Sequence, residues 1–193
     1  THANAPCDTN TVFSVDIGEA CKDGIPDNID LMNNIGGVIG INHAYILTDV
    51  NDNILLFNIN NSFYNIDQLD AGEYRIYGLS YQGLLTVLNG MPLATITSTN
   101  CVTISSNYVP IRVYDPPTMA NAGPDKFSCG PNIIELEADS VFSGMGMWSQ
   151  ISGPSSVTFF PNATTPRNFI VGAASGIYEF EWSVTNGVCP SSS

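Results

Sequence analysis

Positive charge is the scarcest property of this sequence. Five Lys and Arg residues stand against 18 Asp and Glu residues, which gives a formal net charge of −13 at pH 7. Charged residues of both signs make up 12% of the chain, about half the share in an average globular protein. Binding to phosphate backbones or to anionic lipid needs a basic face, and five cations cannot build one. We therefore expect neither a nucleic-acid partner nor attraction to an anionic membrane surface.

Long apolar runs are also missing. No run approaches the ~20 residues that span a bilayer, so we expect no membrane insertion. Residues 1–4 carry no basic region, and no apolar signal segment follows them. The sequence therefore predicts a mature product or an excised fragment, and its polar, Lys-poor composition is common in secreted and cell-surface β proteins.

Motifs for catalysis and metal binding are absent as well. The chain has two histidines and no Gly-x-Ser-x-Gly, His-Glu-x-x-His, phosphate-loop or Cys-x-x-Cys pattern. Glu179 and Glu181 stand two apart in a predicted strand, where they would share the solvent face as ordinary surface residues. We therefore expect a protein that is not an enzyme and uses no cofactor.

The sequence does contain many short β-forming runs. Hydrophobic residues make up 44% of it, and 17 Gly and 12 Pro residues separate runs rich in Val, Ile, Thr, Tyr and Phe. This pattern predicts an all-β protein. The expected strands are 11–17, 28–32, 44–49, 54–59, 63–66, 73–81, 102–105 and 109–114 in the first half, and 133–137, 145–149, 156–160, 168–171 and 177–185 in the second.

A predicted boundary divides the chain at Asp115-Pro116-Pro117. Two consecutive prolines favour an extended, stiff connection and block both helix and central strand. We expect two tandem β-sandwich domains, 1–116 and 117–193, joined by this Pro-Pro linker.

The second predicted domain is built around an alternating strand near its end. Its apolar residues fall on one side and its polar residues on the other. A Cys, a Trp, this aromatic strand and a second Cys follow one another as in an immunoglobulin-like sandwich. Such a sandwich has one more strand after Cys189, so we expect the last strand to be missing and the edge of 177–185 to be open. The side chains that mark this open-edge strand are Tyr178, Phe180, Trp182 and Val184.

An internal echo links the two halves. Gly72-Glu73-Tyr74 and Gly176-Ile177-Tyr178 each place a glycine two residues before a tyrosine that opens a strand. This arrangement resembles the tyrosine corner of sandwich folds.

Five cysteines in a β protein of this composition predict disulfides and an oxidising compartment. Cys7 precedes the first strand of the first half, and Cys101 precedes its last pair of strands. In a sandwich the first and last strands run parallel and start at the same end, so the two cysteines are expected at that end. Cys7–Cys101 is therefore slightly favoured, with Cys21–Cys101 as the alternative and Cys21 otherwise a free thiol or a partner for another chain.

Several shorter patterns are candidate sites. Asp23, Asp27 and Asp30 could hold calcium, with a solvated acidic loop as the alternative. Asp49-x-Asn51-x-Asn53 lacks the glycine and distal Glu of a calcium loop and predicts a hairpin turn. Asn162 begins an Asn-x-Thr sequon, and Ser140 lies in a short pattern for O-glycosylation.

The second half resembles the PKD-like, Ig-like repeats of large cell-surface proteins in Bacteroidetes. The residues that carry the resemblance are Asn121-Ala122-Gly123-Pro124-Asp125, Cys129-Gly130, Met147-Trp148, Ile151-Ser152-Gly153-Pro154 and the ending from Tyr178 to Cys189. The resemblance implies a Cys129–Cys189 disulfide between the ends of the domain.

The first half resembles another repeat of the same class of proteins. The matching residues are Cys7, Cys21-Lys22-Asp23-Gly24, Ala44-Tyr45-Ile46-Leu47-Thr48-Asp49, Asn53-Ile54-Leu55, Gly72-Glu73-Tyr74, Ile76-Tyr77-Gly78-Leu79 and Cys101. These proteins are typically exported by the type IX secretion system, and many are adhesins, gliding-associated filaments or stalks of secreted enzymes.

Together, these observations predict a structural, non-enzymatic segment of an extracellular filament, stalk or adhesin, whose partners are neighbouring repeats or subunits that could donate a strand to the open edge. The alternative is a carbohydrate-binding or spacer module of a secreted hydrolase, in which exposed tyrosines such as Tyr77 and Tyr81 stack on a surface glycan.

Overall fold

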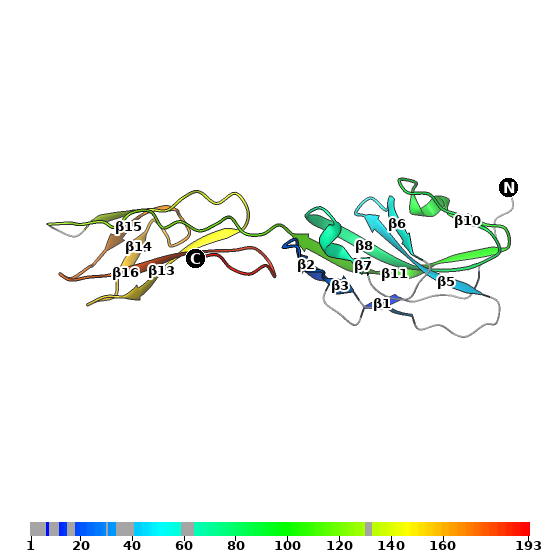
Figure 1. Cartoon of the computed structure of the whole chain (residues 1–193), viewed down its shortest axis with the longest axis horizontal. Coiled ribbons are helices and arrows are strands. Elements are labelled where there is room, and N and C mark those ends of the chain that lie inside the picture. The colour runs from blue at the N-terminus through cyan, green and yellow to red at the C-terminus, as the bar shows by residue number, and fades with distance from the viewer. Residues whose placement is uncertain are drawn as a thin grey trace. The chain divides into compact units, whose positions relative to one another are not determined.

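The structure, a computed structural model, describes residues 7, 12–14, 18–29, 31–33, 41–58, 64–129 and 133–193. The chain divides into two compact units, Thr1–Val113 and Tyr114–Ser193, and each is described by itself. Every described element is a strand or a single 3-10 turn, so the predicted all-β class is confirmed. The sheets are curled, which is compatible with β-sandwich packing (Figure 1). No helix in the described ranges is long and apolar enough to cross a bilayer.

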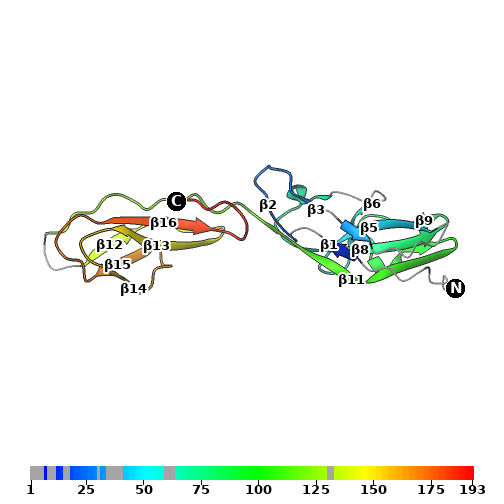
Figure 2. The same cartoon turned by 90° about the horizontal axis from the view of Figure 1, so that it is seen from below.

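The first unit is organised around a five-stranded sheet. Its strands, in spatial order, are β2 (Glu19–Cys21), β11 (Cys101–Tyr114), β8 (Gly72–Gln82), β5 (Asn42–Asp49) and β6 (Ile54–Asn58). Strands β5, β8 and β11 lie side by side in Figure 2. Three smaller pairs accompany the sheet: β1 (Val12–Ser14) with β4 (Leu31–Asn33), β3 (Asn28–Ile29) with β7 (Tyr64–Asn65), and β9 (Leu85–Thr86) with β10 (Thr97–Ser98).

Both faces of this sheet are buried. Along β5, Tyr45 and Leu47 join one apolar cluster, while Ala44 and Ile46 join another. Since successive side chains of a strand point to opposite faces, the two clusters lie on opposite sides of the sheet. A short 3-10 turn contributes to each cluster: η1 (Ile66–Gln68) supplies a buried Ile to the first, and η2 (Leu93–Thr95) a buried Leu to the second.

Two small sheets enclose a single core in the second unit. One has the order β12 (Ile134–Glu137), β15 (Arg167–Val171), β14 (Thr158–Phe160), and the other pairs β13 (Met145–Ser152) with β16 (Glu179–Thr185) (Figure 1). Trp148 and Trp182 meet in the core with ring centroids 5.2 Å apart. Leu136, Ile170 and Val184 complete the buried cluster around them. The two tryptophan rings thus lie at the centre of this core.

In both halves, the tyrosine of the echo forms a hydrogen bond with the backbone of its own chain segment. The Tyr74 hydroxyl donates to the backbone oxygen of Asp70 at 2.7 Å, and the Tyr178 hydroxyl accepts from the backbone N–H of Ala174 at 2.8 Å. Each tyrosine thus reaches the backbone four residues upstream. The preceding glycines, Gly72 and Gly176, have φ angles of +158° and +151°. This is the geometry expected of a tyrosine corner, and both units contain it.

Some predicted strands differ from the observed ones. The two strands expected at 102–105 and 109–114 form one continuous strand, β11, with a register shift between Ile104 and Tyr108. The short strands β2, β9 and β10 were not predicted. Most of the predicted opening strand, 11–17, lies outside the described residues.

Candidate functional site

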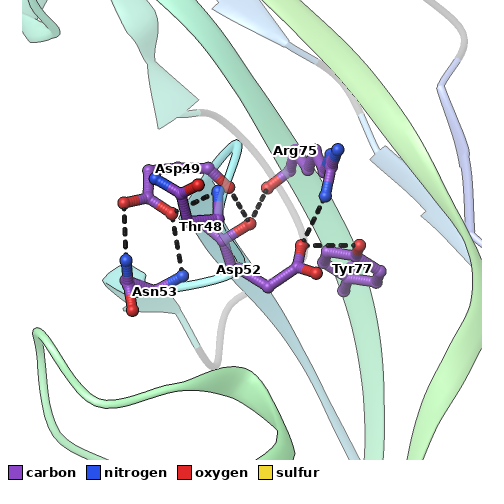
Figure 3. Close-up of polar contacts among 7 residues, drawn as sticks. Thr48, Asp49, Asp52, Asn53, Arg75 and Tyr77 are labelled. Atoms are coloured by element: carbon purple, nitrogen blue, oxygen red, sulfur yellow. Dashed lines mark hydrogen bonds and ion pairs between the residues drawn. The ribbon is translucent and has the colours of Figure 1, made fainter.

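The richest group of polar contacts in the first unit surrounds the β5–β6 turn. It consists of Asp49, Asp52, Asn53, Arg75 and Tyr77, and is called the turn cluster below (Figure 3). Asp49 Oδ1 accepts hydrogen bonds of 2.8 Å from the backbone N–H of Asn51 and of Asn53, and Asp49 Oδ2 accepts a third from Asn53 Nδ2 at 2.8 Å. These donors, led by the Asn53 side chain, lower the pKa of Asp49. The predicted hairpin turn is confirmed, and its acidic residue binds the turn's own amides.

Asp52 connects this turn to the neighbouring strand. It has a φ of +61°, a conformation that Asn and Asp tolerate better than most residues. Asp52 Oδ1 accepts from Arg75 Nη1 at 2.8 Å and from the Tyr77 hydroxyl at 2.9 Å (Figure 3). The hydrogen bond that Arg75 donates to Asp52 raises the pKa of Arg75, whereas burial is the main reason why the pKa of Tyr77 is raised. The contacts within the turn cluster therefore hold the hairpin against β8.

A shallow groove of about 540 Å³ lies next to the turn cluster on the first unit. Arg75 covers the Tyr108 ring, with 4.9 Å between the guanidinium carbon and the ring centroid, and Tyr77 packs on the same ring at 5.5 Å. Arg112, whose Nη1 lies 3.9 Å from Glu73 Oε1, lines the groove as well. The groove thus gathers two of the five cations beside an aromatic ring that is 43% exposed. Glu19 and Glu73 line the groove too, so its polar groups of both signs can bind hydroxyl groups.

The cysteines pair differently from one of the expectations. Cys7 and Cys101 form a disulfide, as the order of the strands favoured. Cys21 and Cys189 are also disulfide-bonded, so Cys21 is not a free thiol. Cys129 is free and exposed. The expected Cys129–Cys189 disulfide is therefore wrong: Cys189 is already bonded, and its Sγ lies 3.4 Å from the backbone oxygen of Asp115.

The acidic residues proposed for calcium have local roles in the structure. Asp23 Oδ1 accepts from the backbone N–H of Ile25 at 2.9 Å, and Asp27 Oδ2 accepts from that of Cys21 at 3.1 Å. Asp30 lies outside the described residues. The part of the chain that the structure describes contains no group of three or more residues suited to a metal ion. The observed contacts of Asp23 and Asp27 are those of carboxylates that order a loop.

Both candidate glycosylation residues are on the surface of the second unit. Ser140 and Asn162 are exposed. Asn162 Oδ1 accepts hydrogen bonds from the backbone and the hydroxyl of Thr164, at 3.0 and 2.7 Å. Exposure permits modification of either residue, and the glycosylation of both stays a prediction.

The four side chains that mark the open-edge strand differ in how deeply they are buried. Trp182 and Val184 are buried in the core, and Phe180 is half-buried beside Phe159, with ring centroids 5.9 Å apart. Tyr178 precedes β16, and its ring stacks on that of Phe180. Three of the four residues therefore belong to the strand.

Sequence reasoning did not identify the groove, the roles of Arg75 and Tyr108 in it, or the contacts of Asp52 with Arg75 and Tyr77 beside it. Arg75 and Tyr108 are 33 positions apart in the sequence, and they meet because β8 and β11 pair with Tyr77 opposite Tyr108. The one available signal was that Arg75 and Tyr77, two positions apart in the predicted strand 73–81, lie on the same side of it.

Comparison with protein-family models finds no match for the chain. Comparison with curated proteins also finds no match.

Proposed function

We propose that the chain is a structural, non-enzymatic segment of a bacterial extracellular filament, stalk or adhesin. In this proposal, 1–116 and 117–193 are tandem Ig-like and PKD-like sandwiches that extend a larger protein, exported by a type IX system in the Bacteroidetes. Their partners are neighbouring repeats or subunits, joined in part by strand addition.

The repeated tyrosine corner is the observation that carries the proposal. Tyr74 and Tyr178 each bind the backbone four residues upstream, after glycines of similar backbone conformation. A feature typical of Ig-like sandwiches and repeated in both units favours tandem domains of one structural class over a single catalytic body. Proteins built from such units in series commonly serve as extended stalks that present other domains.

Disulfides support the extracellular location. Cys7–Cys101 joins residues 94 positions apart, and Cys21 and Cys189 are bonded as well. Disulfides persist in oxidising compartments and are rare in the bacterial cytosol. A cell-surface or secreted protein fits this chemistry.

Contacts at the start of the second unit support a stiff connection. Asn186 Nδ2 donates to the backbone oxygen of Asp115 at 2.8 Å. Gly187, with a φ of +54°, lies against the Tyr114 ring, where an added Cβ would come within 2.4 Å of a ring atom. The residues before Pro116-Pro117 are therefore immobilised within this unit, and the two prolines restrict the backbone that follows.

The decisive test is an in-frame deletion of the segment from the gene of the producing bacterium. If the role is structural, the deletion shortens or removes surface filaments seen by immunogold electron microscopy and reduces adhesion, while secreted hydrolase activities stay unchanged. Loss of a polysaccharide-degrading activity with filaments intact would contradict the proposal.

The groove favours the second candidate, a carbohydrate-binding module of a secreted hydrolase. The relevant residue is Tyr108, because Tyr77 and Tyr81 are half-buried and pack against the second apolar cluster. A glycan array should then show saturable binding that Tyr108→Ala abolishes. Phe142→Ala, which changes an aromatic residue that is 93% exposed on the other unit, is the matched control. An array on which the unaltered chain binds no glycan excludes this candidate.

A further inference from the structure

A covalent bond joins Cys7 to the first residue of strand β11. The Cys7–Cys101 disulfide holds the two Cα atoms 5.3 Å apart and closes a loop with 94 positions between its ends. Thr103, two residues further along β11, donates from its hydroxyl to the backbone oxygen of Cys7 at 3.1 Å. The chain before Cys7 is therefore connected to the start of β11 without passing through the residues between the two cysteines.

Strand β11 continues from the disulfide to the beginning of the second unit. It has 14 residues, more than any other described strand, and its last residue, Tyr114, is the first residue of the second unit. β11 pairs with β8 along one edge and with β2 along the other. The next residue, Asp115, accepts the hydrogen bond of Asn186 through its backbone oxygen within the second unit. A single paired strand thus connects the disulfide to an anchored residue.

This order of covalent bonds determines the route of a pulling force. A force applied between the N-terminus and Asp115 follows the shortest covalent route, which is Cys7, the disulfide and β11. A strand rises about 3.3–3.4 Å per residue, and a fully extended chain spans at most about 3.3–3.6 Å per residue, so β11 can lengthen very little. Strands β5, β6 and β8 lie inside the closed loop and off this route.

We propose that the Cys7–Cys101 disulfide makes the first unit almost inextensible under tension, because the force passes through β11 and leaves the closed loop unloaded. The inference rests on the proposed function, a segment of a filament, stalk or adhesin, and specifies how such a segment keeps its length. Without the disulfide, the force would pass through all 94 positions of the loop. Unfolding would then lengthen the unit by about 300 Å, because a chain of that length spans about 310–340 Å when extended.

Optical tweezers test this on the full chain. Handles are attached at the N-terminus and at Met119, which is 84% exposed and belongs to the second unit, through residues that carry an azide. The oxidised chain should lengthen without a large step as the force rises. After reduction, the same chain should show a step of about 300 Å as the first unit unfolds.

Two variants assign the effect to one disulfide. Cys21 and Cys189 are bonded as well, so the measurement is repeated with both replaced by Ser, and this variant should behave like the unaltered chain in both states. Adding Cys7→Ser and Cys101→Ser to this variant should produce the long step without reductant. Cys129→Ser, which changes the exposed free thiol, is the control and should leave the oxidised trace unchanged.

A step of about 300 Å in the oxidised, unaltered chain would overturn the proposal. Identical traces before and after reduction would also overturn it, because the disulfide would then not determine the route of the force. The measurement uses purified protein and is independent of the deletion in the bacterium. An inextensible first unit together with unchanged filaments would contradict the proposed function alone.

Discussion

Gly146 illustrates how a single residue limits the core of the second unit. It faces Val184 across the β13–β16 pair and is buried. A Cβ at this position would lie 2.0 Å from Cζ2 of Trp182, much closer than two carbon atoms can approach. The backbone therefore provides the space into which the Trp182 ring fits, and the two tryptophans can pack only because position 146 has no side chain.

We expect Gly146→Ala to destabilise the second unit by about 1–3 kcal/mol, because the extra methyl group overpacks the core. Urea unfolding followed by tryptophan fluorescence measures this unit alone, since both tryptophans of the chain belong to it. Met147→Ala, at a neighbouring side chain that is 54% exposed, is the control and should have a much smaller effect. An unchanged midpoint for Gly146→Ala would contradict the packing described here.

Asp49 predicts a specific dependence of stability on pH. Its pKa is lowered in the folded state by the hydrogen bonds of the turn. The carboxylate therefore stabilises the fold at pH values above about 4, the usual pKa of an unfolded Asp, and this contribution is lost as the pH falls through the lower, folded pKa. In Asp49→Asn, the free energy of unfolding should be lower at neutral pH and should fall less steeply below pH 4.

The measurement for Asp49→Asn is a series of urea unfolding curves between pH 7 and pH 2. Asp125→Asn, at an exposed residue of the other unit, serves as the control for the loss of one charge. Parallel curves for Asp49→Asn and the unaltered chain would show that the turn hydrogen bonds do not depend on ionisation of Asp49.

At the scale of elements, β11 shows how a buried side chain repairs an irregular strand. Its pairing with β8 shifts register between Ile104 and Tyr108. Within this shift, the hydroxyl of buried Ser105 accepts from the N–H of Gly78 at 3.0 Å and donates to the oxygen of Asn107 at 2.6 Å. One side chain thus replaces a bond that the ladder cannot make, and the strand continues.

Ser105→Ala should destabilise the first unit by about 1–3 kcal/mol, because the buried Gly78 N–H loses its partner. Ser106→Ala, at the adjacent exposed residue, is the matched control and should change stability far less. Both are measured by urea unfolding followed by far-ultraviolet circular dichroism. Equal effects of the two variants would mean that the Ser105 hydroxyl does not sustain the strand.

Elements with a strong local pattern could be predicted, and those that depend on distant contacts could not. The alternation in β16 and the Asn- and Asp-rich turn after β5 are local signals, and both are confirmed. Sequence reasoning predicted a gap between two strands at the polar residues that follow Ser105. The strand is continuous there because the Ser105 hydroxyl binds Gly78 of another strand, and no local pattern indicates that contact. The short pair β9–β10 has no local signal at all. The groove was missed for the same reason, since it needs the register of β8 against β11.

At the scale of the molecule, covalent links add to noncovalent packing. Cys7–Cys101 closes a loop over most of the first unit, with 94 positions between its ends. Which of the five cysteines pair with each other could not be deduced from their order, because many connectivities suit the same spacing. The family resemblance suggested Cys129–Cys189, whereas the structure leaves Cys129 exposed and free.

Replacing both Cys7 and Cys101 by Ser should lower the free energy of unfolding of the first unit by about 5 kcal/mol, as expected when a loop of this length loses its closure. Scanning calorimetry would record the change as a lower transition temperature. Cys129→Ser is the control and should alter stability by no more than about 0.5 kcal/mol. A similar loss in the control would indicate that Cys129 is not the free thiol.

The Cys7–Cys101 disulfide affects what happens to the chain when a protease cuts it. If an enzyme cuts one peptide bond in the connection between β9 and β10, the two pieces stay attached through the sulfur atoms, since the cut lies inside the closed loop. On a gel without reductant the nicked chain would migrate as one molecule, and only reductant would release the fragments. Damage to the backbone at that place therefore does not sever the chain.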